Sequence, residues 1–182
     1  MSSYQRRNNA TWRDDEEFGK AQETLLLPIV KAFFCSNSLK QHPDKWYYSD
    51  YIDTDADGCE VGYEVKTREC YSTNEKMQNE GVMINTKKVM MNEVLIFNFW
   101  DKVYYYRVKP EQIKSFLRTR FKRPTRSCGY ENTNDDVMYI PFEVLSLLHT
   151  YNPEREHQAV KSKTEGAEQR RGRCLIDISS LV

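Results

Sequence analysis

Two acids and a lysine at a characteristic spacing are the residues of this sequence best suited to chemistry. Thirteen residues separate Asp50 from Glu64, and Lys66 follows Glu64 by two positions. Two carboxylates on adjacent strands can hold Mg²⁺, a hard cation that prefers oxygen ligands. The metal would lower the pKa of a bound water, and a nearby lysine would stabilise the negative charge that develops on a phosphate. This combination is sufficient for hydrolysis of a phosphodiester bond.

A β-hairpin is the element that must position these three residues. Residues 47–52 are aromatic and β-branched, residues 53–58 end in an Asp-Gly turn, and residues 59–67 follow as a second strand. Strand side chains alternate between faces, so the pattern predicts a core face with Val61, Tyr63, Val65 and Thr67. The opposite face then carries Glu60, Gly62, Glu64 and Lys66.

The order of these residues resembles the PD-(D/E)XK, or restriction-endonuclease-like, nuclease superfamily. Asp50 and Glu64-Val65-Lys66 match its motif, and Gly19-Lys20-Ala21-Gln22-Glu23, in a preceding helical pattern, resembles its first-helix glutamate. Ser49 stands where the family often has proline. The resemblance implies an α/β fold with a restriction-endonuclease-like core, in which helices flank a mixed β-sheet.

The same resemblance implies roles for these residues. Asp50, Glu64 and the carbonyl of Val65 would bind Mg²⁺ or Mn²⁺, Lys66 would position the water and stabilise the transition state, and Glu23 would support the metal through water. The implied activity is hydrolysis of DNA by an endonuclease of restriction, resolvase or repair type. DNA is then the partner, and a homodimer is one option.

Other functions remain open for the same stretch. Asp53 is an alternative to Asp50 as the metal ligand. Asp53-x-Asp55-x-Asp57-Gly58, followed by five residues and Glu64, also matches the EF-hand calcium loop. That loop requires a helix on each side, whereas Trp46-Tyr47-Tyr48 favours a strand. The remaining alternatives are a calcium site on a β-turn, a nucleic-acid-binding module without catalysis, and a surface hairpin with solvated charges.

The rest of the chain predicts alternating helices and strands. Thr11 opens a helix that we expect to kink or break at Pro28, because proline lacks an N–H and clashes with the carbonyl of Thr24. Residues 94–100 predict a central strand that pairs through a tight turn with residues 103–108. A short helix is predicted from Ser72, and a longer one from Pro110, whose apolar face carries Ile113, Phe116, Leu117 and Phe121. Beyond it we expect a loop over residues 127–136 and a strand over residues 137–140. The last predicted element is a helix over residues 142–151 that ends near His149.

Three basic regions are candidates for binding nucleic acid. One is the only dense basic run, with Arg118, Arg120, Lys122, Arg123 and Arg126. Such a run would contact backbone phosphates without reading sequence, and the alternative is a solvated helix end. The others are Arg68 at the strand end and, because a helix with a basic residue often follows the motif strand in the superfamily, Lys87 or Lys88.

Composition limits the class of protein. The 182 residues carry 27 acidic and 27 basic residues, so no global basic field directs the chain to nucleic acid. The five cysteines form no Cys-x-x-Cys pair, and the sequence shows neither an apolar signal segment nor an apolar run of transmembrane length. These features predict an intracellular protein of the cytoplasm or nucleus, neither secreted nor bound to membrane. We expect a nuclease-like domain over residues 11–151 and a polar extension over residues 152–182. That extension is predicted to be disordered over residues 152–173, and its apolar end either adds an edge strand or binds a partner.

Overall fold

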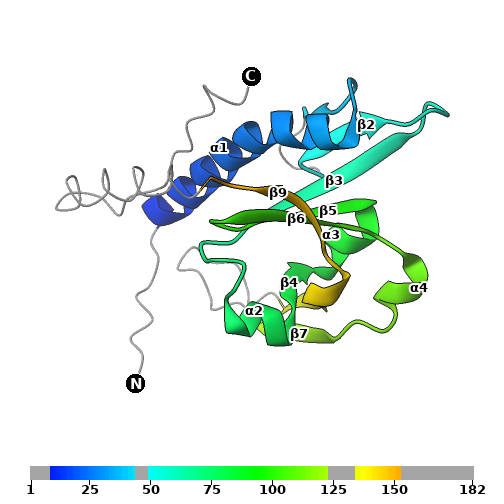
Figure 1. Ribbon diagram of the computed structural model, residues 1–182. Helices are drawn as coiled ribbons and strands as arrows, with labels where there is room; N and C mark the ends of the chain where they lie inside the picture. Colours follow the sequence, from blue (N-terminus) through cyan, green and yellow to red (C-terminus); the bar gives the residue numbers. More distant parts are fainter. Residues whose placement is uncertain (1–8, 44–48, 123–133, 153–182) are drawn as a thin grey trace.

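The computed structural model describes residues 9–43, 49–122 and 134–152 and shows a mixed α/β fold (Figure 1). The helices are α1 (Asn9–Phe34), α2 (Glu75–Glu80), α3 (Thr86–Met91) and α4 (Pro110–Ile113), with a short 3₁₀ turn, η1 (Phe142–Val144). The strands are β1 (Lys40–Gln41), β2 (Tyr51–Thr54), β3 (Glu60–Thr67), β4 (Val82–Asn85), β5 (Val94–Asn98), β6 (Lys102–Arg107), β7 (Arg118–Lys122), β8 (Asn134–Ile140) and β9 (Ser146–Thr150).

The larger sheet is mixed, in the order β1-β2-β3-β5-β6-β9. β3 and β5 run parallel, and the other neighbouring pairs are antiparallel. Parallel neighbours require a crossover connection, which here contains α2, β4 and α3. Every residue of β5 is buried, which confirms the predicted central strand covered on both faces. The sequence therefore predicted correctly a mixed sheet flanked by helices.

Two hydrophobic cores lie on opposite faces of this sheet. On one face, Val94 and Ile96 of β5 pack with Leu26 and Val30 of α1 and with Tyr51, Tyr63 and Val65 of the hairpin. On the other face, Leu95 and Phe97 pack with Val89 of α3 and with Val82, Ile84, Met138 and Ile140 of the smaller sheet. Figure 1 shows α1 on one side of the larger sheet and the smaller sheet, with α2 and α3, on the other.

The smaller sheet, in the order β4-β8-β7, corrects the helix predicted from Pro110. That helix ends at Ile113, and residues 118–122 form β7, in which Phe121 pairs with Asp135 of β8. Leu117, predicted on an apolar helix face, is exposed. Pairing with β8 outweighs the helical pattern, because hydrophobic residues spaced for a short helix also suit a strand whose partner comes later in the chain.

The helix predicted over residues 142–151 is wrong as well. η1 is followed by β9, which pairs antiparallel with β6. Leu148 is buried in the sheet core while Leu147 is exposed, as expected for alternating faces of a strand. His149 therefore lies in β9 rather than at a helix end, and its ring contacts that of Tyr151.

Of the kink or break predicted at Pro28, the break does not occur, because helix α1 continues through this residue. Pro28 is exposed, and water can therefore serve the carbonyl that loses its N–H partner. Leu26 and Val30, on either side of the proline, are fully buried and hold the helix on the sheet. Burial of this face compensates for the missing hydrogen bond, which shows how packing overrides local propensity.

Some predicted segments fall outside the described residues: residues 46–48, most of the loop at 127–136, and all of the C-terminal extension except Asn152. In the part of the chain that is described, no helix is both long and apolar enough to span a membrane.

Gly62 is the position at which β3 accepts the C-terminal end of α3. A Cβ at this position would lie 2.7 Å from Ser49 Oγ, 2.9 Å from Asn92 Oδ1 and 3.3 Å from the carbonyl oxygen of Met91. We expect Gly62→Ala to lower the free energy of unfolding by about 1–3 kcal/mol through overpacking, measured by urea denaturation. Gly19→Ala, where the new Cβ has room, should be neutral or stabilising, and equal effects of the two changes would contradict this packing constraint.

Candidate carboxylate site

The hairpin register brings Asp50 opposite Glu64. β2 and β3 pair Tyr51 with Tyr63 and Ile52 with Gly62, so one further step sets Asp50 across from Glu64 on the same face. The backbone N–H of Asp50 donates to the carbonyl of Tyr63 at 2.8 Å. The Asp50 carboxylate accepts from the N–H of Val65 at 2.6 Å. Asp50 therefore satisfies a backbone donor of β3 at the level where β2 begins.

Glu64 is a buried carboxylate with a cationic partner. Its side chain is only 4% exposed, and its Oε2 lies 2.6 Å from the Nζ of Lys88 on α3. This is a charge-assisted hydrogen bond of the strong kind. Glu64 belongs to the face of β3 opposite the predicted core face, yet the structure buries it beneath α3. The crossover that makes β5 parallel to β3 also supplies the counter-ion.

Glu23 reaches the same region from α1. Its carbonyl oxygen accepts a 2.5 Å hydrogen bond from the hydroxyl of Tyr51, which ties α1 to β2. The neighbouring Gln22 is buried and bonds Asn98 of β5, whose amide oxygen accepts from Tyr151. This polar network fixes the helix at the turn that carries Glu23.

The three carboxylates share one electrostatic environment. Burial raises the pKa of Glu64 from its ordinary 4.5 to about 8, with a contribution from the charge of Asp50 that Lys88 and Lys66 oppose. Burial and Asp50 also raise the pKa of Glu23 to about 7, against the charges of Lys20, Lys88 and Lys66. The structure thus brings Glu23, Asp50, Glu64 and Lys66 within electrostatic range of one another. Shifted pKa values of this kind are common among the titratable groups of binding and catalytic sites.

Lys66 lies on the same face of β3 as Glu64, two residues along the strand. Desolvation lowers the pKa of Lys66, while the charges of Glu64 and Asp50 raise it. The residue as a whole is nevertheless exposed to solvent. Lys66 is more exposed than Lys88, the other lysine close to Glu64.

Asp53 belongs to the opposite face. It pairs with Val61, and its carboxylate accepts hydrogen bonds from Ser36 at 2.7 Å and Ser38 at 2.5 Å, just after α1. Asp55 accepts from the N–H groups of Asp57 and Cys59 and stabilises the hairpin turn. The turn joins two strands rather than two helices, and its acids do not surround a common point with Glu64. The geometry of an EF-hand is therefore missing.

The donor chemistry of the site fits a hard divalent cation. Asp50, just before β2, and Glu64, in β3, both offer carboxylate oxygens, and burial together with the charge of Asp50 raises the pKa of Glu64. Among the described residues, however, no group of three or more His, Cys, Asp or Glu side chains is already arranged to hold a metal. Lys88, rather than a third ligand, is the closest partner of Glu64. Cation binding at this site therefore requires a side chain to move.

The residues expected to contact nucleic acid lie in different surroundings. Arg68 donates to the carbonyl of Met83, and its Nε is buried with no hydrogen-bond partner among the described residues. Lys87 is exposed on α3. Arg118 and Arg120 are exposed on β7, where Arg120 forms a 3.2 Å ion pair with Asp136. The backbone of Lys122 ends β7, whereas Arg123 and Arg126 lie outside the described residues.

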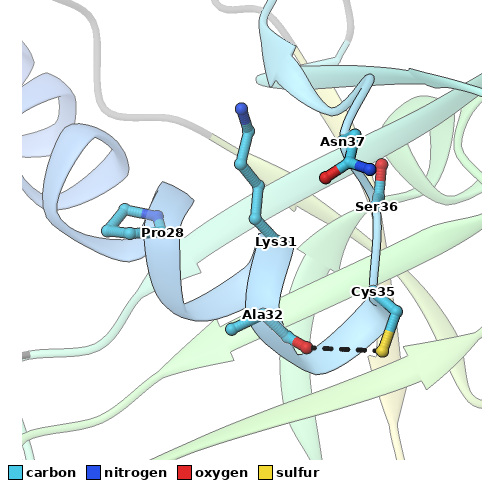
Figure 2. A pocket seen from close by; sticks show the side chains of 6 residues that line it. All are labelled: Pro28, Lys31, Ala32, Cys35, Ser36 and Asn37. Atoms are coloured by element: carbon cyan, nitrogen blue, oxygen red, sulfur yellow. Dashed lines mark hydrogen bonds between the residues drawn. The ribbon is translucent and has the colours of Figure 1, made fainter. Parts of the chain in front are cut away.

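A surface hollow at the C-terminal end of α1 lies apart from the carboxylates. It is lined by Pro28, Lys31, Ala32, Cys35, Ser36 and Asn37 (Figure 2). Cys35 adopts φ of 53° and its thiol donates to the carbonyl of Ala32, which closes the last turn of the helix. None of the residues predicted to do chemistry lines this hollow, so we do not assign the function to it.

Sequence reasoning missed one feature of the site, the pairing of Lys88 with Glu64. Lys88 was predicted as a DNA contact, on a helix inferred from a family pattern. The signal available in the sequence was the pair Lys87-Lys88 ahead of a central strand. Which lysine turns inward depends on the phase of α3, and that phase is set by Val89, which is buried in the core beside it.

The raised pKa of Glu64 predicts how stability depends on pH. Folded Glu64 keeps its proton up to about pH 8, whereas in the unfolded chain it loses the proton near 4.5. Between these values the folded state binds more protons, so rising pH lowers the free energy of unfolding. In buffer with EDTA, Glu64→Gln should therefore gain stability relative to the unsubstituted protein as pH increases from 5 to 8, measured by urea denaturation at each pH.

Glu80→Gln is the matched control for this prediction. Glu80 is exposed and pairs only loosely with Lys76, at 3.8 Å. Its substitution should leave the shape of the pH profile unchanged. Parallel profiles for Glu64→Gln and the unsubstituted protein would show that Glu64 titrates normally.

Comparisons with known proteins add no assignment to this geometry. No family model matches the chain, no curated protein matches its sequence, and no solved structure matches its fold. What the site does must be argued from its own residues.

Proposed function

We propose that the chain is a Mg²⁺-dependent deoxyribonuclease with a restriction-endonuclease-like core that hydrolyses phosphodiester bonds. One observation carries this proposal: the register of β2 and β3 sets Asp50 across from Glu64, with Lys66 on the same face. Metal-dependent hydrolysis of a phosphodiester bond requires two acids and a lysine placed in this way.

The order of the elements supports the proposal. Helix α1 precedes the β2–β3 hairpin, and the crossover through α3 leads to β5, parallel to β3. Glu64 therefore lies on a strand in the middle of a mixed sheet, and Asp50 directly precedes the neighbouring strand β2. A rigid scaffold is what a site needs if its charges are to be held in place during a reaction.

Each residue has a distinct role in this proposal. Asp50 and Glu64 would hold the cation, which would supply Lewis-acid stabilisation of the charge that develops on the phosphate. Lys66, exposed on the same face of β3, would stabilise the same charge. Glu23, with its pKa near 7, can accept or hold a proton at the pH of the cell.

A second function has one observation in its favour. Glu64 already has Lys88 as its cationic partner, and the described residues contain no preformed set of three ligands. A nuclease-like fold that binds nucleic acid without cleaving it would have both properties. The two functions differ in one measurable property, cleavage that depends on a divalent cation.

Substitution of Lys66 tests the proposed function. Lys66→Ala removes the exposed cation and should reduce cleavage by about 10²-fold or more, the order expected for loss of an electrostatic contact to the transition state. Glu64→Gln should abolish cleavage. Both are measured with Mg²⁺ and with Mn²⁺ on linear, branched and single-stranded DNA.

Asp57→Asn is the control, because Asp57 is exposed in the hairpin turn and lies away from the carboxylates. This variant should cleave like the unsubstituted protein. Full activity in Glu64→Gln, or no divalent-dependent cleavage of any of these DNAs by the unsubstituted protein, would exclude the nuclease.

A further inference from the structure

Lys88 and Glu64 form the one contact of the site that conflicts with metal binding. Nζ of Lys88 lies 2.6 Å from Oε2 of Glu64, and the two side chains are 26% and 4% exposed. Mg²⁺ binds carboxylate oxygens at about 2.1 Å. A cation bound to this oxygen and an ammonium bound to it would lie within about 4 Å of each other, where like charges in a partly buried place repel strongly.

We propose that Lys88 is a displaceable counter-ion of this site, which a divalent cation must remove from Glu64 before it binds. This inference rests on the proposed function, since it takes Glu64 as a metal ligand. It explains how the buried carboxyl group of Glu64 is tolerated without metal: Lys88 gives it a cationic hydrogen-bond donor at 2.6 Å. Displaced from Glu64, the ammonium remains beside the site as a second cation, next to Lys66, and is available to contact a phosphate.

The backbone of α3 is held in place while the Lys88 side chain can move. Asn85 caps the helix by accepting a hydrogen bond from the N–H of Lys87 at 2.9 Å. Asn92 donates to the carbonyl of Lys88 at 2.8 Å and is itself buried against Gly62. Only the flexible stem of Lys88 has to change rotamer, and its 26% exposure gives it a path to solvent.

The close approach of Gly62 to α3 determines where Lys88 lies relative to Glu64. Without a side chain at Gly62, the C-terminal end of α3 packs directly on β3, two residues before Glu64. This packing sets Lys88 over the carboxylate. Lys87, one position earlier on the helix, points to solvent instead.

The experiment compares Lys88→Met with Lys87→Met. Met keeps most of the apolar stem of lysine and removes its charge. Binding of Mg²⁺ and of Mn²⁺, without DNA, is measured by titration calorimetry. Lys88→Met should bind each ion about tenfold more tightly or better, because the competing cation has gone, whereas Lys87→Met should bind like the unsubstituted protein. Lys88→Arg, which keeps the charge, should show no gain.

A thermal melt of the same proteins gives a readout that does not depend on activity. In EDTA, Lys88→Met should melt at a lower temperature than Lys87→Met, because Glu64 has lost its partner. Saturating Mn²⁺ should then raise its melting temperature by more than it raises that of the other proteins. Should Lys88→Met fold poorly, Lys88→Gln, which keeps a hydrogen-bond donor, replaces it in both measurements.

The outcomes separate the inference from the proposed function. Equal ion affinities in Lys88→Met and the unsubstituted protein would overturn the inference and leave the metal site intact. Binding of metal only after Lys88 is replaced would support the inference in its strongest form. If neither protein binds Mg²⁺ or Mn²⁺ at millimolar concentration, the inference and the proposed function fail together.

Discussion

Burial of the Glu64 carboxylate is the constraint on which the rest of this structure depends. A charged group removed from water costs several kcal/mol unless a partner compensates it, and a raised pKa is the alternative response. Both responses occur here, because Lys88 pairs with Glu64 and the pKa of Glu64 still rises to about 8. The protein therefore retains at the centre of its sheet an ionisable group whose charged form is costly to bury, where a purely structural strand would have an apolar residue.

The parallel pairing of β3 and β5 is what makes that burial possible. A parallel neighbour cannot follow a tight turn, so the chain leaves the sheet and returns through α2, β4 and α3. The returning segment covers the face of β3 that carries Glu64 and places Val89 in the core beside Lys88. The same topology that buries the acid thus delivers its counter-ion, and the two cannot be separated by a change in one element alone.

The sequence predicted the strand that carries the motif better than the elements around it. Alternation over residues 59–67 and the unbroken apolar run of β5 are strong local signals, and both strands form as expected. Residues 142–151 and the region after Ile113 were predicted as helices but contain strands. Leu147, Leu148 and Phe121 suit a helix as well as a strand until their partner strands are known. Those partners lie far away in the sequence, and pattern alone cannot supply them.

The aspartate-rich turn shows why spacing acquires meaning only through secondary structure. Asp53, Asp55, Asp57 and Glu64 match a calcium loop letter by letter, yet a strand reverses its side chains at each residue. In the observed register Asp53 shares a face with Val61 and bonds Ser36 and Ser38, whereas Glu64 lies on the other face. Asp50 comes one residue before the paired residues of β2, opposite Glu64, and its side chain is therefore on the same face of the sheet as that of Glu64. The hairpin register therefore places Asp50, and not Asp53, on the same face of the sheet as Glu64.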